Sequence, residues 1–252
     1  MPGGMTFVGV RASQSLSVPA INPATLSWEV LLDSRSIPPI ANGAPIPLWP
    51  DTSGKGRDAN PVPGFNPLYR PASSPTGLAL ADFGPVATGR QMFGTLPVGG
   101  VGNTLGFSFY SWYVIDTLNS AGAGDGMFIF DASIGSGFGL GPAGFVSPGV
   151  MRPFALTSAG GVQGGSSSLG VHMLTCICTP PAGTGVCQVF HDGALVATGT
   201  WNANPNTNYL ISGNSVQNIP LNGRAGFVGF RAAADSDRTR QGIEKFLKQT
   251  WG

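Results

Sequence analysis

Short apolar segments separated by glycine and proline are the feature that most restricts the fold of this chain. The 39 glycines and 22 prolines are spread between these segments and do not gather in one region. Segment 107–115 is aromatic and β-branched, which is typical of a buried strand. Asp192-Gly193 marks a tight turn between two further strands. The pattern predicts an all-β domain of many short strands, and 252 residues suffice for one large sandwich.

One segment, residues 236–251, has a helical pattern instead. Asp235 or Ser236 can cap its first turn. Its apolar residues recur on one face: Ile243, Phe246, Leu247 and Trp251. The sequence therefore predicts one C-terminal helix that packs by this face.

Three segments together resemble one family. They are Trp-Pro-Asp-Thr-Ser-Gly-Lys-Gly-Arg-Asp-Ala at residues 49–59, the hairpin around Asp192-Gly193, and the helix ending in Trp251-Gly252. In combination they resemble the concanavalin A-like, laminin-G-like jelly-roll domains of the lectin and glucanase superfamily. The resemblance implies a two-sheet antiparallel jelly-roll sandwich with one C-terminal α-helix. We expect this domain over residues 28–252, preceded by an N-terminal arm at residues 1–27.

Charge is scarce in this chain. Charged residues make up 10% of the sequence, against a usual value of about 25%, and the net charge is +1. The sequence shows no basic field for nucleic acid, no lysine-rich face for a membrane surface, and no apolar run near the ~20 residues of a membrane span. A surface so poor in charge predicts burial by neighbouring subunits, as in a homo-oligomer or a larger assembly.

The N-terminal residues 1–7 lack the basic and apolar regions of a secretory signal. With the resemblance, this predicts a virion structural protein made in the host cytoplasm, such as a phage capsid decoration or tail/fibre component. Its arm, residues 1–27, would dock on other virion subunits, and its lectin-like domain could bind host-surface glycans. The alternative is a carbohydrate-binding module or adhesin of a bacterial cell surface, which would need a signal or partner domains.

Catalysis is not predicted. Glycoside hydrolysis usually needs two carboxylates about 5–9 Å apart. The two glutamates, Glu29 and Glu244, have no carboxylate partner two or four residues away. The Gly-x-Gly-x-x-Gly match at residues 139–144 precedes a segment that cannot be helical, so it does not predict dinucleotide binding. We therefore expect a non-enzymatic protein.

A glycan site is predicted in the amide-rich loop at residues 200–209. An aromatic platform beside amide groups suits sugar recognition on a scaffold loop. The candidate residues are Trp201, Asn202, Asn206 and Tyr209. The alternative is that Trp201 is buried at the sandwich edge and the asparagines form turns.

No cofactor is expected, although two metal possibilities stay open. Cys176, Cys178 and Cys187 could be reduced core residues, could form a Cys178–Cys187 disulfide, or could bind zinc with His172 and His191. Calcium could be bound by turn aspartates, although turn capping explains these residues equally well. The candidate aspartates are Asp51, Asp58, Asp125 and Asp192.

Overall fold

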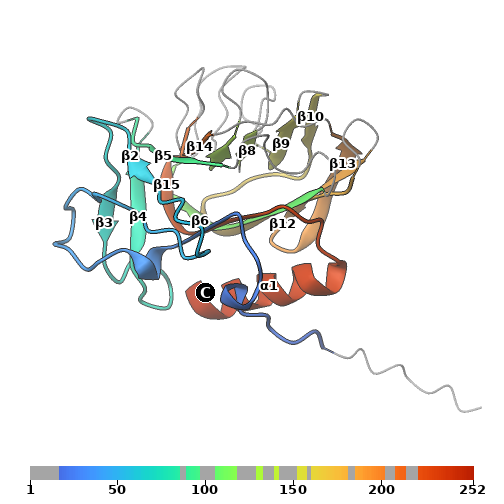
Figure 1. Cartoon of the computed structure of the whole chain (residues 1–252), viewed down its shortest axis with the longest axis horizontal. Helices are drawn as coiled ribbons and strands as arrows, with labels where there is room; N and C mark the ends of the chain where they lie inside the picture. Colours follow the sequence, from blue (N-terminus) through green and yellow to red (C-terminus); the bar gives the residue numbers. More distant parts are fainter. Residues whose placement is uncertain are drawn as a thin grey trace, which may run out of the picture.

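Two antiparallel β-sheets stack face to face in the computed structural model of the chain, and a helix packs beneath the larger sheet (Figure 1). The structure describes residues 17–85, 89–96, 106–117, 129–132, 139–141, 152–157, 160–180, 185–201, 208–213 and 221–252. The prediction of an all-β jelly-roll sandwich with one C-terminal helix is confirmed.

The larger sheet has eight strands, in the order β13-β12-β11-β6-β15-β4-β3, with β1 also paired to β15. Their bounds are β1 Val30–Asp33, β3 Leu68–Arg70, β4 Leu80–Gly84, β6 Phe107–Ile115, β11 Gly170–Cys178, β12 Val186–His191, β13 Ala194–Thr200 and β15 Gly223–Arg231. The predicted aromatic strand, β6, lies at the centre of this sheet between β11 and β15. Its central position explains why every residue of β6 is buried.

The smaller sheet has seven described strands, in the order β10-β9-β8-β7-β14-β5-β2. Their bounds are β2 Asn60–Pro61, β5 Met92–Thr95, β7 Phe130–Asp131, β8 Gly139–Gly141, β9 Phe154–Thr157, β10 Gly160–Gln163 and β14 Asn208–Ile211. The first three residues of the formal Gly-x-Gly-x-x-Gly match, Gly139–Gly141, form β8 and are therefore extended.

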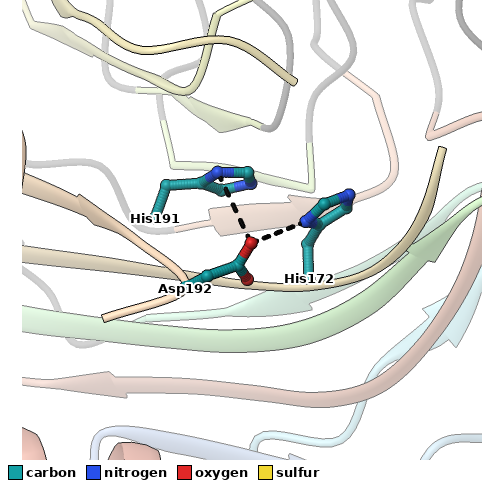
Figure 2. Close-up of side chains that lie close together, drawn as sticks. All are labelled: His172, His191 and Asp192. Carbon is teal, nitrogen blue, oxygen red and sulfur yellow. Dashed lines mark hydrogen bonds and ion pairs between the residues drawn. The ribbon is translucent and has the colours of Figure 1, made fainter. Parts of the chain in front are cut away.

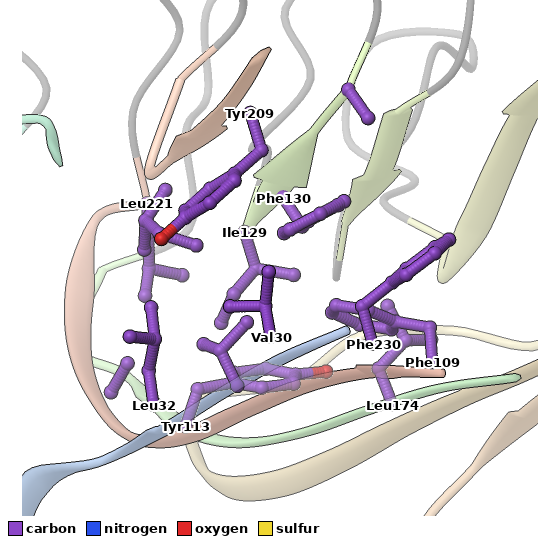
Figure 3. Close-up of a cluster of buried hydrophobic side chains, with 14 of the residues drawn as sticks. Val30, Leu32, Phe109, Tyr113, Ile129, Phe130, Leu174, Tyr209, Leu221 and Phe230 are labelled. Atoms are coloured by element: carbon purple, nitrogen blue, oxygen red, sulfur yellow. The ribbon is translucent and has the colours of Figure 1, made fainter. Parts of the chain in front are cut away.

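The main hydrophobic core fills the space between the sheets (Figure 3). Alternate residues of each strand point inward, because successive side chains of a strand face opposite sides. Aromatic rings make up much of this layer: Phe130 stacks on Tyr209 and on Phe230, with ring centroids 5.6 and 5.5 Å apart. The core therefore joins strands that are distant in sequence.

A second core lies between the outer face of the larger sheet and helix α1, Asp237–Trp251. The Ser236 side chain caps the helix by accepting the N–H of Thr239, as predicted. The expected apolar face packs on the sheet through Ile243, Leu247 and Trp251, which are fully buried. The stability of this helix therefore comes mainly from its packing on the sheet. No helix of the described part is long and apolar enough to cross a membrane.

Residues 17–27 lie along α1 of the same chain. The Ile21 N–H donates to the Gly242 carbonyl at 2.9 Å, and the Lys245 ammonium donates to the Val18 carbonyl at 3.1 Å. The Ile21 side chain approaches Gly242 so closely that an added Cβ would lie 2.6 Å from it. The described part of the expected arm therefore packs on its own domain. Residues 1–16 lie outside the described residues, and docking through them stays a prediction.

The family-like stretch at residues 49–59 is a loop that is hydrogen-bonded to β1. Trp49 is fully buried and pairs with Ala59 across the base of the loop. The Asp51 carboxylate accepts hydrogen bonds from the Leu31, Ser53 and Arg57 backbone N–H groups and from the Ser53 hydroxyl. The stretch therefore has a structural role in the described fold.

Glu29 adds a charged contact to the same loop. Its carboxylate pairs with Lys55 and Arg57. Burial raises the pKa of Glu29, but the two cationic hydrogen-bond donors outweigh it and lower the pKa overall. The lowered pKa means that this contact stabilises the fold above the unfolded-state pKa and is lost as the pH falls through the folded-state pKa.

Glu29→Gln is therefore expected to lower the free energy of unfolding by about 1 kcal/mol at pH 7. The difference from wild type should shrink below about pH 4, where glutamate is protonated in the unfolded chain. Urea unfolding of wild type and Glu29→Gln at pH 7 and below pH 4 measures this difference in the free energy of unfolding. An equal difference at both pH values would show that the charge pairs contribute nothing.

Candidate functional site

The aromatic residues predicted to bind glycan are core residues. Trp201 is fully buried; its indole N–H donates to the Thr179 carbonyl at 2.6 Å, and its ring is perpendicular to that of Phe107, with the centroids 5.2 Å apart. Tyr209 is 1% exposed, and its hydroxyl donates to the Arg57 carbonyl at 2.6 Å.

Neither ring offers a face to a ligand, which corrects the predicted platform. The physical reason is that both rings belong to the core between the sheets: Tyr209 lies in β14, and Trp201 directly follows β13. Asn202 and Asn206 lie outside the described residues, so their part of the prediction is untested. Substituting Trp201 would report on stability and not on binding.

The cysteines form part of the core. Cys176, Cys178 and Cys187 are buried and free, and Cys178 lies directly opposite Cys187 on the neighbouring strand. Burial raises the pKa values of the Cys176 and Cys178 thiols well above the ordinary value. These thiols are therefore protonated at neutral pH, as expected of small hydrophobic residues.

The residues considered as possible metal ligands do not all lie together. In the part of the chain that the structure describes, the group that could hold a metal consists of His172, His191 and Asp192, with no cysteine (Figure 2). Zinc bound by cysteines together with His172 and His191 was one of the open possibilities, and no cysteine belongs to this group of described residues. Asp51 and Asp58 accept hydrogen bonds from their own loop, and Asp125 lies outside the described residues. Calcium stays a prediction.

A polar cleft opens on the larger sheet beside β3, where β4 and β6 end and β15 begins. It encloses about 300 Å³, at the lower end of the range for small-molecule sites. Ala81 and Phe83 belong to the inter-sheet core, so Asp82 between them faces the outer side of the sheet. The lining residues are Arg70, Asp82, Gly84, Pro85, Arg90, Asp116, Thr117 and Asn222.

Asp82 is the fixed acidic group of this cleft. Its Oδ1 accepts the Gly84 N–H at 2.7 Å, and its Oδ2 accepts Nε of Arg70 at 2.7 Å. The Arg90 guanidinium lies 3.8 Å from Oδ1, beyond hydrogen-bond distance, and its side chain is 19% exposed. Arg90 is thus held near the carboxylate while its own donors can reach a ligand.

A second acidic group, Asp116, lies directly after β6. Arg224 donates two hydrogen bonds to its carboxylate, from Nη2 to Oδ1 at 2.6 Å and from Nε to Oδ2 at 3.1 Å. The Asp116 side chain is 42% exposed, so it keeps acceptor capacity towards the cleft. A register shift between Gly223 and Arg224 re-aims β15 here. Such bulges are common beside functional sites because they redirect side chains.

The cleft combines anionic acceptors, cationic donors and an amide in one small space. A ligand with adjacent hydroxyl groups could both donate to the carboxylates and accept from the guanidinium groups. No pair of unengaged carboxylates lines it, since each aspartate is bound to an arginine. Glu29 and Glu244 do not line it either. Its chemistry is that of a polar binding site.

Sequence reasoning missed this cleft. Its residues come from the ends of four strands that meet through long-range pairing, and the distance between them in sequence hides the grouping.

Solved binding domains share this architecture. The binding domain of botulinum neurotoxin DC in complex with SialylT matches with a TM-score of 0.59 and 14% identity, over 91% of this chain and 55% of that chain. Domain 4 of AbnA, a GH43 extracellular arabinanase from Geobacillus stearothermophilus, in complex with arabinotriose, matches with a TM-score of 0.58 and 13% identity, over 86% of this chain and 98% of that chain.

The binding domain of botulinum neurotoxin serotype D also matches, with a TM-score of 0.58 and 12% identity, over 87% of this chain and 51% of that chain. This chain spans about half the length of the neurotoxin chains. No protein-family model matches the sequence, and no curated protein matches it. At these identities the likeness establishes the fold, an antiparallel β-sandwich of the class found in these binding domains.

Proposed function

We propose that this protein is a non-enzymatic, lectin-like domain that binds glycans in the polar cleft. The observation that carries the proposal is the lining of that cleft, where Asp82, Arg90 and Asp116 present charged acceptors and donors around about 300 Å³. The fold is that of domains solved in complex with SialylT and with arabinotriose, which supports a carbohydrate as the ligand class.

The ion pairs of the cleft explain how it could select a polyhydroxyl ligand. Asp82 and Asp116 are oriented by Arg70 and Arg224, so they are held in place before a ligand arrives. Preorganised groups lose less entropy on binding. With three arginines against two aspartates, the cleft and its rim also favour a sugar that carries a carboxylate over a neutral one.

The test is a glycan array containing neutral and acidic glycans, followed by titration calorimetry with the best ligand. Arg90→Ala should weaken binding at least ~10-fold, because a hydrogen bond from a charged donor is worth about 1.5–3 kcal/mol. Arg238→Ala is the matched control, because Arg238 is exposed on α1 outside the cleft. It should bind as wild type does.

Two results would contradict the proposal. One is no glycan bound by the folded protein at millimolar ligand. The other is equal affinity in wild type and Arg90→Ala, which would place the ligand elsewhere on the domain.

We further infer that the domain works on the surface of a virus particle, as a capsid decoration or tail/fibre component. The support is the 10% charge content, which suits a surface covered by neighbouring subunits, together with the lectin-like resemblance. Residues 1–16 would contact other virion subunits, and a homo-oligomer is expected by light scattering.

Sedimentation of native particles followed by antibody detection tests this setting. Co-sedimentation with particles supports the virion role. Detection on intact bacterial cells in the absence of particles would favour the alternative, a carbohydrate-binding module or adhesin of a bacterial cell surface.

A further inference from the structure

The two histidines of this chain lie side by side, although 18 residues separate them in sequence. His172 belongs to β11 and His191 ends β12, and their rings stack with centroids 4.7 Å apart. Both side chains are 8% exposed. Leu174 follows His172 at the next inward position and belongs to the inter-sheet core. The pair therefore lies at one end of the space between the sheets.

Asp192 reaches this pair from the tight turn after β12 (Figure 2). The turn places Asp192 and Gly193 at φ values of +53° and +86°, the left-handed region that Asp tolerates better than most residues. Oδ1 of Asp192 accepts the Met173 N–H at 2.8 Å, which fixes the carboxylate. Its other oxygen, Oδ2, then points between the two imidazoles.

The contacts of His172 determine where its proton lies. Nε2 is 2.9 Å from the Ser168 carbonyl oxygen, which can only accept, so Nε2 carries a hydrogen. Nδ1 lies 2.8 Å from Oδ2 of Asp192. A carboxylate oxygen and an imidazole lone pair repel at this distance unless a cation lies between them. That cation is either a second proton on His172 or a metal ion.

His191 distinguishes this cluster from an ordinary ion pair. Its Nδ1 is 3.7 Å from Oδ2 of Asp192, beyond hydrogen-bond distance, and its Nε2 has no hydrogen-bond partner in the described structure. A buried polar group left without a partner costs about 1–3 kcal/mol. A metal on Nδ1 would not supply a partner for Nε2; with the hydrogen on Nε2, however, the Nδ1 lone pair is left to ligate an ion held beside Oδ2 of Asp192.

We propose that His172 Nδ1, His191 Nδ1 and Asp192 Oδ2 form a binding site for a divalent transition metal of the zinc class. One ligand atom from each residue lies within 4.8 Å of the others. Four-coordinate zinc with bonds of about 2.1 Å needs ligand atoms about 3.4 Å apart. The observed separations from Oδ2, 2.8 and 3.7 Å, lie on either side of this value.

The surroundings fit this metal class. Imidazole nitrogen with one carboxylate suits Zn²⁺, Co²⁺ or Ni²⁺, whereas Ca²⁺ and Mg²⁺ prefer oxygen ligands alone. A ligating histidine usually donates its other N–H to a carbonyl or carboxylate, as Nε2 of His172 does to Ser168. The Asp192 side chain is 46% exposed, which gives an ion and a fourth ligand, water, access from solvent.

Titration of the metal-free protein with Co²⁺ and then Zn²⁺ tests the site. We expect one equivalent of Co²⁺ to bind, visible d–d absorption without a thiolate charge-transfer band, and displacement of Co²⁺ by Zn²⁺. Because the chain has two histidines, ¹⁵N imidazole spectra of the unaltered protein should show both rings shifting together. This readout needs no variant that could fail to fold.

Variants locate the ligands. His172→Gln and His191→Gln should each weaken Zn²⁺ binding at least ~100-fold. Cys187→Ser should bind as wild type does, and so should Asp237→Asn, the matched carboxylate control, whose side chain is 79% exposed on α1. The proposal is overturned if no saturable one-equivalent binding occurs or if His191→Gln binds Zn²⁺ unchanged. The contact between His172 and Asp192 would then be bridged by a proton alone.

Discussion

Trp251→Ala is expected to lower the free energy of unfolding by about 3–5 kcal/mol, the range for removing a fully buried tryptophan. Trp251 is the last residue of α1 and has no solvent exposure. Its ring stacks on Trp112 of the central strand at 6.2 Å and meets Phe227 edge-on at 5.8 Å. The Arg35 guanidinium lies 5.1 Å from its centroid. One side chain thus ties the helix to the sheet.

Guanidinium unfolding followed by circular dichroism measures the loss. Trp251→Phe is the matched control, because it keeps an aromatic ring, and the Trp251 indole N–H has no hydrogen-bond partner to lose in the described structure. It should cost less than half as much as the alanine substitution. Equal losses in both variants would mean that specific ring contacts, and not the buried area, hold the helix.

The helix and the central strands could be predicted because their signals are local. The spacing of Ile243, Leu247 and Trp251 records one buried face within a single segment, and that face is the one that packs. The aromatic and β-branched run of β6 likewise predicts a strand without knowledge of its neighbours. The stretch at residues 49–59 is also a local signal, and its resemblance predicts the sandwich fold that the structure has.

The sites could not be predicted in the same way because they depend on partners that the sequence does not reveal. Composition favoured Trp201 and Tyr209 as an exposed platform, yet aromatic residues serve a core equally well, and both are buried. The cleft around Asp82 and Asp116 needs the pairing of β15 with β4 and with β6, 108 residues or more away in sequence.

The histidine cluster could be predicted in part from the sequence. Because side chains alternate along a strand, the even-numbered His172 shares a face of β11 with Cys176 and Cys178, and the odd-numbered His191 shares a face of β12 with Cys187. This alternation could not show that the rings lie at the end of the strands, where the turn brings Asp192 within reach. Alternation along a strand predicts which face of the sheet a side chain lies on. Predicting a set of metal ligands also requires the position of each residue along its strand and the direction of the following turn.

Asp51→Ala is expected to lower the free energy of unfolding by about 3 kcal/mol, because it removes the acceptor of four hydrogen bonds at once. The donors are the backbone N–H groups of Leu31, Ser53 and Arg57 and the Ser53 hydroxyl, at 2.6–3.0 Å. Leu31 lies in β1, so the loss reaches the sheet and does not stay in the loop. Urea unfolding measures it.

Two further variants define what the loop does. Asp51→Asn should be intermediate, since an amide keeps one acceptor oxygen but turns donor hydrogens towards the remaining N–H groups. Lys55→Ala, the control within the same loop, removes one surface ion pair and should cost at most about 1 kcal/mol. Glycan affinity should be unchanged in all three folded variants, because residues 51–57 do not line the cleft. Loss of binding with retained stability would instead assign the loop to the ligand, and the family-like stretch would then have a functional role as well as a structural one.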